Sequence, residues 1–321
     1  MKRLFSITLV GILILTLVIT GCGGGNKKAD SPRFADCIYV SSVNDANGSI
    51  WSINADGTGS RELVANSDDD IYLLQPTLST DRSRIAYLRY DDDEGTMQVM
   101  TIIANNLTPQ LVSTPGLINT FTSHGHIALS PDGTKLAYVD SSYHIQVITI
   151  GSSSPVQLTD CSSGQDHNPS WSPDGNQISF LHRDTSTYNA KIYKINADGS
   201  SVNPYSDELY SMDTLAILND SLLDPSWSPV NENQMTIRAR ESVSNLQFYI
   251  YTLNLTTKAR TRLTTTTDGN TEIFHQWSKD GIYIFTTGSE RNIYRTPVND
   301  PSQTTRMTTD GKSSFYGFPP S

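Results

Sequence analysis

Five polar residues occupy one recurring position in this sequence, three or four residues before the serine of a repeated phrase: Gln75, His126, Asn168, Asp224 and His275. A neutral imidazole near pH 7 binds a divalent metal or hydrogen-bonds a sugar or a carboxylate, and amide and carboxylate groups make similar contacts. We therefore predict that these five residues bind a ligand. The pattern requires no cofactor and leaves a divalent metal as one alternative. The other alternative is that they only line a water-filled space.

Sequence patterns of common catalytic sites are missing. The sequence has no Gly-x-Ser-x-Gly, His-Glu-x-x-His, phosphate-binding P-loop or Cys-x-x-Cys pattern. Two acidic runs, 68–70 and 91–94, offer oxygen ligands for Ca²⁺, but they lack the alternating spacing of a calcium loop. We interpret both runs as solvated loop charge, and we regard catalysis as the less favoured class of function.

A phrase that recurs five times must position the five polar residues. Its best copy covers 169–180 (PSWSPDGNQISF), and the aligned serines are Ser79, Ser130, Ser172, Ser228 and Ser278. Polar and apolar residues alternate before the serine, which predicts a strand, and Trp171, Trp227 and Trp277 share one inward position. Ser-Pro-Asp-Gly after the strand is typical of a tight turn.

Each phrase begins a unit of four predicted strands, and Asn-Ala-Asp-Gly at 54–57 and 196–199 leads into the fourth. Four antiparallel strands in such a unit are typical of one β-propeller blade. The N-terminal unit begins at Ile38 without its first strand, and the last seven residues, 315–321, resemble that strand. We therefore predict an all-β, six-bladed propeller over 37–321, closed by the C-terminal strand, which also covers an aggregation-prone edge.

The longest insertion covers 205–224 and has apolar residues at partly helical spacing. Two interpretations of this insertion stay open: a short helix packed on the ring, or a flap that binds a partner.

Trp-Ser-Pro-Asp-Gly at 171–175, together with the Asn-Ala-Asp-Gly turns, resembles the TolB-like β-propeller repeat family over roughly 37–321. The resemblance implies the propeller fold, but the same repeat occurs in envelope scaffolds, peptidase accessory domains and some lyases. Some oligogalacturonate lyases with related propellers bind a divalent metal through His and Gln at the channel mouth. The resemblance therefore adds a metal-assisted, polysaccharide-active enzyme as an alternative. TolB itself has a further α/β domain before its propeller, for which we see no room here.

The N-terminus has the pattern of an export signal. Lys2 and Arg3 precede an apolar run over 4–19, which is shorter than the ~20 residues that span a membrane comfortably. The ending Ile-Thr-Gly-Cys at 19–22 resembles the lipobox of bacterial lipoproteins, which implies cleavage before Cys22 and its acylation, with palmitate as a typical chain. We therefore predict a signal peptide over 1–21 and a lipidated Cys22 with a flexible tether over 22–36. An uncleaved membrane anchor is the alternative.

Composition limits the partners. The 33 acidic against 23 basic residues give a formal net charge of −10, which argues against nucleic acid. Gly23 after the cysteine favours, by resemblance, the outer membrane facing the periplasm in a diderm cell, whereas in a monoderm cell we expect the cell surface. Cys37 and Cys161 lie far apart in the repeat scheme, so two thiols are favoured over a disulfide.

These observations favour a monomeric, lipid-anchored protein of the cell envelope that acts as a non-catalytic binding or scaffold protein for a protein or glycan partner. The alternative is the metal-assisted polysaccharide enzyme, with its site at the channel mouth. A purely structural spacer is a third hypothesis.

The lipobox makes one direct prediction. Replacing Cys22 by Ala removes the only sulfur that the acyl chain could join at this position, so we expect loss of acyl labelling and accumulation of the uncleaved precursor. Metabolic labelling with a palmitate analogue, followed by gel mobility, measures both effects. Persistent labelling of the Cys22→Ala protein would contradict the assignment.

Overall fold

The computed structural model describes residues 33–42, 48–117, 127–161, 164–187, 189–201, 203–211, 224–242, 245–264, 275–288 and 291–314. The chain divides into two compact units, 1–31 and 32–321, and all described residues belong to the second unit. Within the described ranges, no helix has the length and apolar character needed to cross a membrane.

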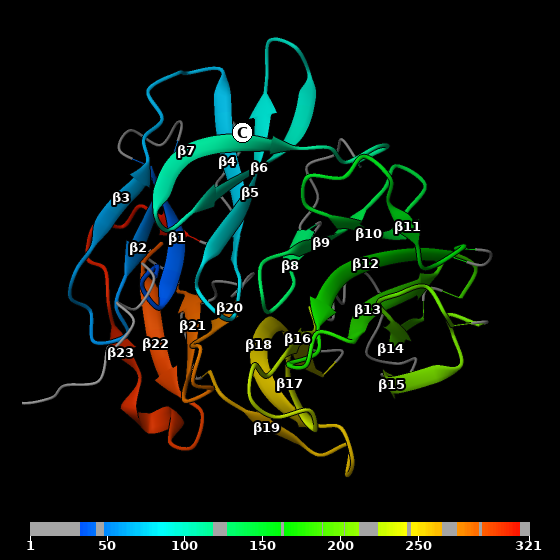
Figure 1. Cartoon of the computed structure of the whole chain (residues 1–321). Coiled ribbons are helices and arrows are strands. Elements are labelled where there is room, and N and C mark those ends of the chain that lie inside the picture. The colour runs from blue at the N-terminus through cyan, green and yellow to red at the C-terminus, as the bar shows by residue number, and fades with distance from the viewer. Residues whose placement is uncertain are drawn as a thin grey trace, which may run out of the picture. The chain divides into compact units, whose positions relative to one another are not determined.

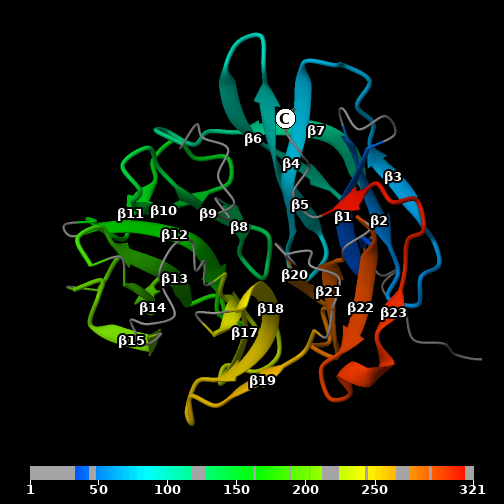
Figure 2. The same ribbon diagram turned by 180° about the vertical axis from the view of Figure 1, so that it is seen from behind.

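The described residues form six four-stranded antiparallel sheets, which follow one another in chain order around a central axis (Figures 1 and 2). The prediction of a six-bladed β-propeller is therefore confirmed.

The strands of each blade are given from the inner strand outward. Blade 1 contains β24 (Ser313–Ser314), β1 (Cys37–Ser42), β2 (Gly48–Ile53) and β3 (Arg61–Val64). Blade 2 contains β4 (Ile71–Leu78), β5 (Arg84–Asp91), β6 (Thr96–Ile103) and β7 (Asn106–Val112). Blades 3 and 4 contain β8 (Ile127–Leu129), β9 (Lys135–Val139), β10 (Ile145–Thr149) and β11 (Val156–Gln157), then β12 (Gly164–Trp171), β13 (Gln177–Asp184), β14 (Ala190–Asn196) and β15 (Asp207–Ser211). Blades 5 and 6 contain β16 (Ser226–Trp227), β17 (Gln234–Ser242), β18 (Asn245–Asn254) and β19 (Arg260–Arg262), then β20 (His275–Trp277), β21 (Tyr283–Thr287), β22 (Ile293–Pro297) and β23 (Thr305–Arg306).

The repeated serines hold the turn that follows each inner strand. Ser172 is 2% exposed; its hydroxyl donates to the Asp174 carboxylate at 2.6 Å and accepts from the Gln177 amide N–H at 2.9 Å. The equivalent pairs around Ser79, Ser130 and Ser278 repeat this arrangement. We call the end of the channel at these serine turns the turn end.

Hydrophobic clusters of the described residues fill the gap between each pair of neighbouring blades. The tryptophans add polar links across these gaps. The Trp171 indole N–H donates to the Ala128 carbonyl at 3.0 Å, and the Trp277 indole N–H donates to the Ser226 carbonyl at 3.1 Å. The predicted shared position of the tryptophans is thus the place where one inner strand is fixed to the next.

The ring closes where the two ends of the domain meet. β24 pairs antiparallel with β1, with Ser314 opposite Val40 and Ser313 opposite Ser41. The Ser41 hydroxyl also donates to the Asp310 carboxylate at 3.0 Å. The predicted closure by a C-terminal strand is confirmed at 313–314, whereas the predicted strand at 315–321 lies outside the described residues. Residues 212–223 of the insertion also lie outside them, and 207–211 form β15.

The segment that leads into β1 is fastened to the turn end of the ring. The Phe34 amide N–H donates to the Arg82 carbonyl at 2.9 Å, and the Phe34 side chain is 5% exposed. Asp36 pairs with the Arg82 guanidinium and accepts from the Ala55 amide N–H. The chain therefore enters the propeller at the turn end.

Cys37 and Cys161 are free thiols, as expected from the sequence. Burial raises the pKa of Cys37 well above its usual range. Burial and the neighbouring Asp166 carboxylate raise the pKa of Cys161 to about 12. Both groups are therefore protonated and weakly nucleophilic at neutral pH.

The closure by β24 gives a stability prediction. A chain that ends after Lys312 loses β24 and leaves the edge of β1 unpaired, so we expect the free energy of unfolding to fall by about 2–3 kcal/mol. For a domain of this size, that loss corresponds to a melting temperature lower by about 3–5 °C in calorimetry. Asp310→Ala, which removes side-chain hydrogen bonds at the same seam without shortening the chain, should cause a smaller decrease. An unchanged melting temperature in the truncated protein would contradict the closed ring.

Candidate functional site

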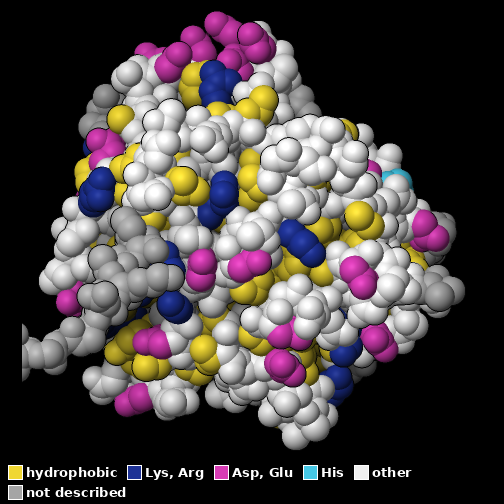
Figure 3. Space-filling model, viewed as in Figure 1, with side chains coloured by type: hydrophobic (Ala, Val, Ile, Leu, Met, Phe, Trp, Pro, Cys, Tyr) yellow, Lys and Arg dark blue, Asp and Glu magenta, His cyan; other side chains and the backbone are white. Residues whose placement is uncertain are grey.

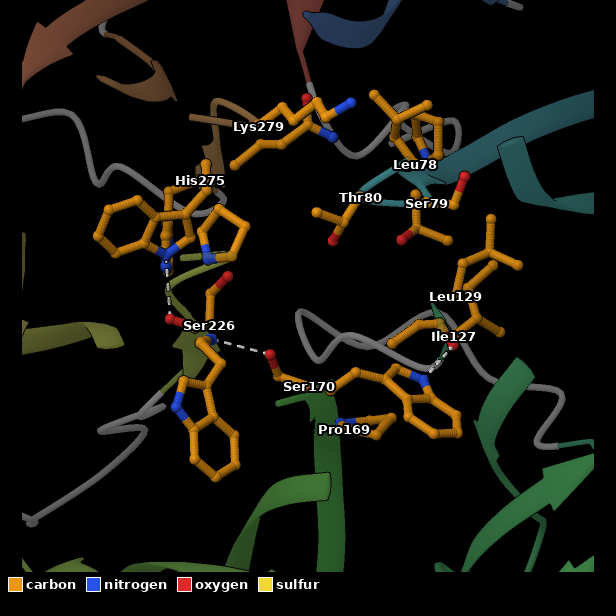
Figure 4. Close-up of a pocket in the computed structure, with 18 of the residues that line it drawn as sticks. Leu78, Ser79, Thr80, Ile127, Leu129, Pro169, Ser170, Ser226, His275 and Lys279 are labelled. Atoms are coloured by element: carbon orange, nitrogen blue, oxygen red, sulfur yellow. Dashed lines mark hydrogen bonds between the residues drawn. The ribbon is translucent and has the colours of Figure 1, made fainter. Parts of the chain in front are cut away.

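The central channel contains a cavity of about 220 Å³. Its wall is built by the inner strands of blades 2–6 and by the serine turns that follow them (Figure 4). The side chains of Ser170, Ser226 and Thr80, from three different blades, surround its open centre in the close-up. Ring closure thus brings together residues that lie far apart in the sequence.

Four of the five predicted site residues line this one cavity: Gln75, Asn168, Asp224 and His275. We call the end of the channel where they lie the mouth. His126 lies outside the described residues, as do His124 and Phe274 near the same position. Ligand binding by these residues stays a prediction.

Gln75 and Asn168 lie within the inner strands β4 and β12 and not in the connections that precede them. The reason is that β4 and β12 begin four residues earlier, at Ile71 and Gly164. Both strands carry a register shift at this point, immediately before a proline. In each strand, the bulge turns the side chain of the residue before the proline toward the channel; this residue is Gln75 in β4 and Asn168 in β12.

The backbone at both bulges is strained. Gln75 has φ 47° and Asn168 has φ 53°, in the left-handed region. A non-glycine residue held there costs on the order of 1–3 kcal/mol and persists only where the surrounding structure enforces it, and such residues cluster at functional sites. The same strained position thus occurs in two blades at the same cavity.

Asn168 links blade 4 to blade 5. Its side-chain amide donates to the Asp224 carboxylate at 2.9 Å, and Asn168 is 3% exposed. The amide oxygen of Asn168 is buried without a hydrogen-bond partner in the described part of the chain. This oxygen is therefore an unsatisfied acceptor inside the channel wall, with almost no surface exposed to the cavity.

The charges at the mouth come from Asp224 and from Arg238 of β17. Burial raises the pKa of Asp224 to about 6, opposed by the Arg238 guanidinium and by the Asn168 hydrogen bond. Arg238 is 3% exposed, and its guanidinium lies 4.6 Å from the centre of the Phe248 ring. Asp224 is thus mostly ionised at pH 7 and has a buried positive charge nearby.

His275 carries no charge at neutral pH. Burial lowers its pKa to about 3, and Arg238 adds to this effect. Both ring nitrogens are buried without a hydrogen-bond partner among the described residues. A neutral imidazole has one donor and one acceptor nitrogen, so both polar groups of His275 stay unsatisfied inside the channel wall.

The described residues contain no group of three or more His, Cys, Asp or Glu side chains that could hold a metal ion. The two acidic runs meet at the tip of blade 2, where Asp93, burial and the other aspartates raise the pKa of Asp70. Acidic side chains gather at this tip on the molecular surface (Figure 3). Residues 68–70 and 92–94 are exposed, which agrees with solvated loop charge.

A second polar cluster, behind Asn168, was missed from the sequence. Asp166 is fully buried and accepts hydrogen bonds from His182 at 2.7 Å, from the Tyr205 hydroxyl at 3.0 Å and from the Cys161 thiol at 3.2 Å. All four residues lie outside the repeated phrase at 169–180, so the repeat alignment gave no signal for their contact. The cluster holds strand β12 in place at Asp166, two residues before Asn168.

Comparison with known proteins identifies relatives of this architecture. A family model described as the TolB beta propeller domain matches residues 35–215. The structure of TolB from Acinetobacter baumannii is similar, with a TM-score of 0.65 and 16% identity over 87% of this chain, and this chain covers 65% of that protein. A putative TolB from Agrobacterium tumefaciens has a TM-score of 0.60 and 15% identity, over 89% of this chain and 91% of that one. An oligogalacturonate lyase in complex with manganese has a TM-score of 0.52 and 9% identity, over 75% and 68%. No curated protein matches the sequence.

The raised pKa of Asp224 predicts a dependence of stability on pH. The folded state holds this proton more tightly than the unfolded state, whose Asp pKa is about 3.9, so the stability contribution of Asp224 is lost as the pH rises from about 4 to about 6. Because Asp224 is partly exposed, we expect a loss of about 1–2 kcal/mol over this range. Asp224→Asn keeps an acceptor for Asn168 and has no charge, so its loss over the same range should be smaller by this amount.

Urea unfolding at pH 4.5 and pH 7 measures the difference, with Asp92→Asn in the exposed acidic loop as the matched control. Equal pH dependence in the wild-type and Asp224→Asn proteins would contradict the prediction.

Proposed function

We propose a binding role, without catalysis, for this chain, which belongs to the TolB beta propeller family. The protein acts in the cell envelope as a lipid-anchored binding or scaffold protein. Its partner is an envelope protein or a glycan, which contacts the mouth of the channel. The family membership supports the propeller architecture, and the binding role rests on the residues of the mouth.

The observation that carries this proposal is the cavity in the central channel, which Gln75, Asn168, Asp224 and His275 line together. Gln75 and Asn168 hold a left-handed backbone at this cavity, and residues with such strained backbone cluster at functional sites. Four polar side chains from four blades therefore converge on one concave site, which is the usual form of a binding site.

The entry of the chain at the turn end supports the anchored arrangement. Phe34 and Asp36 fasten the N-terminal segment to the turn of blade 2. The chain that would carry a lipid on Cys22 is therefore joined to the propeller at the turn end.

The enzyme alternative is less well supported. The similarity to the oligogalacturonate lyase concerns the fold, at 9% identity. In the described part of the chain, the acidic and histidine side chains of the mouth do not form a metal-binding group of three. No observation at the mouth favours catalysis over binding.

Affinity capture with mouth variants tests the proposal. The full-length protein, purified in detergent and immobilised, is incubated with envelope extract as wild type, His126→Ala, Asp224→Ala and Asp92→Ala. We expect one partner to be retained by wild type and by Asp92→Ala, and at least tenfold less of it to be retained by Asp224→Ala, because a carboxylate acceptor on the cavity wall is lost. Equal retention by all four proteins, measured by quantitative mass spectrometry, would place the binding surface elsewhere.

A further inference from the structure

Exposed apolar side chains gather at the turn end. Of the four large hydrophobic side chains that are exposed in the described ranges, three belong to this end: Val156 (44%), Val230 (61%) and Ile282 (50%). Val230 and Ile282 lie in the serine turns of blades 5 and 6. Val156 approaches Gly199, which follows β14 at the same end of blade 4, because a Cβ on Gly199 would lie 2.7 Å from the Val156 side chain. The fourth, Leu111, is on the outer strand β7.

Val230 and Ile282 form one apolar patch across the gap between blades 5 and 6. A Cβ on Gly281 would lie 2.5 Å from the Val230 side chain, and Gly281 directly precedes Ile282. Lys279, in the same turn as Ile282, is exposed as well. Removal of apolar surface from water is favourable, so any contact that covers Val230 and Ile282 is stabilised by their burial.

The chain enters the propeller on the same rim. The Phe34 amide N–H donates to the Arg82 carbonyl at 2.9 Å. Arg82 lines the channel cavity together with Pro229 and Lys279, which lie close to the apolar patch in the sequence. The segment that follows Cys22 is therefore fastened to the end of the propeller that carries the apolar patch.

The predicted tether limits how far this end can lie from a lipid on Cys22. The eleven residues 22–32 precede the first described residue, Arg33, and at full extension they reach about 36–40 Å, at ~3.3–3.6 Å per residue. A short linker of this kind holds its two ends at an effective concentration in the millimolar range. A contact with the bilayer that would be too weak for a free protein is then sufficient.

The acidic runs make the opposite end of blade 2 unsuited to such a contact. Residues 68–70 precede β4 and residues 92–94 follow β5, and Ile71 pairs with Asp91 at the ends of these strands that lie away from the Ser79 turn. Both runs are exposed, and acidic side chains gather at this tip (Figure 3). The negative surface of a membrane with anionic lipids repels such a tip. Charge therefore favours an orientation in which this tip faces away from the bilayer.

We infer that the turn end docks on the surface of the bilayer that holds the lipid of Cys22. Val230 and Ile282 lie in the head-group region, and Lys279 contacts the lipid phosphates. This inference rests on the proposed lipid anchor and adds a second contact to it, which fixes the orientation of the propeller on the membrane.

Fluorescence quenching on vesicles tests the inference. The full-length protein, acylated in bacterial cells and purified in detergent, carries an NBD fluorophore at Val230→Cys or, as the matched control, at Leu111→Cys, whose side chain is also apolar and exposed. Each protein is reconstituted on vesicles of phosphatidylcholine, with and without a third of phosphatidylglycerol, that contain a lipid with a doxyl quencher at its head group. Wild-type protein treated with the same reagent supplies the background, which is small because Cys37 and Cys161 have raised pKa values.

We expect the quencher to reduce the emission of the label at 230 by about half, because interfacial apolar side chains enter the head-group boundary by ~5–10 Å. The label at 111 should keep its emission. Lys279→Glu should reduce the quenching at 230 on vesicles with phosphatidylglycerol, because a cation beside anionic head groups is lost. Ile282→Ser should reduce it on both kinds of vesicle, because apolar contact is lost. The melting temperature of each variant verifies its fold.

Equal quenching at 230 and 111 would overturn the inference, as would unquenched emission at 230 while the protein floats with the vesicles in a density gradient. In both cases the lipid anchor would stand without the docked orientation. A protein that does not float lacks a stable anchor, so the proposed anchor and this inference would both be wrong. The binding role of the mouth is tested separately by affinity capture with Asp224→Ala and would survive each of these results.

Discussion

The structure depends on one constraint: the inner strands of the blades do not pair with each other, so their free edges need other hydrogen-bond partners. Tryptophan supplies part of the solution. Trp171 and Trp277 each donate from the indole to a carbonyl of the preceding inner strand, and both side chains are buried in the gap between two blades. One residue type thus satisfies an edge carbonyl and fills the apolar gap, and the spacing of neighbouring inner strands around the channel follows from it.

The serine turns and the closing strand β24 supply the other contacts that hold the ring together. The serine turns of blades 2, 3, 4 and 6 are each stabilised by their own Ser and Asp, so these blades repeat one local solution. Turns of neighbouring blades also touch, because a Cβ on Gly133, which has φ +68°, would lie 3.3 Å from that of Ser79. The seam between blades 6 and 1 joins the two ends of the domain, which β24 and the cluster around Cys37 and Phe285 hold together.

The repeat made the fold predictable, because strand alternation and the Ser-Pro-Asp-Gly turn are local signals that recur in register. The number of blades and the closure by a C-terminal strand followed from the same alignment. Local signals do not show where an inner strand begins, and the bulges at Gln75 and Asn168 depend on pairing with the next strand. The Asp166 cluster and the Asn168–Asp224 hydrogen bond depend on contacts between blades or across the strands of one blade, at separations of 5 to 56 residues. The alignment therefore indicated which residues face the channel but not which of them touch.

The chemistry of the mouth follows from its place in this ring. The serines recur because they form the turns that follow the inner strands. The position three or four residues before each serine faces the channel instead, and its residue differs between blades: Gln75, Asn168, Asp224 and His275. Strained backbone at two of these residues, a carboxylate with a raised pKa and unpaired polar atoms all reduce the stability of the folded state. A ring can tolerate these local losses, because an apolar cluster fills each of the six gaps between blades. Trp171, Trp227 and Trp277 belong to these clusters and also line the cavity, so the wall of the channel is itself part of the packing between blades. The propeller can therefore hold a polar and strained mouth within a stable domain.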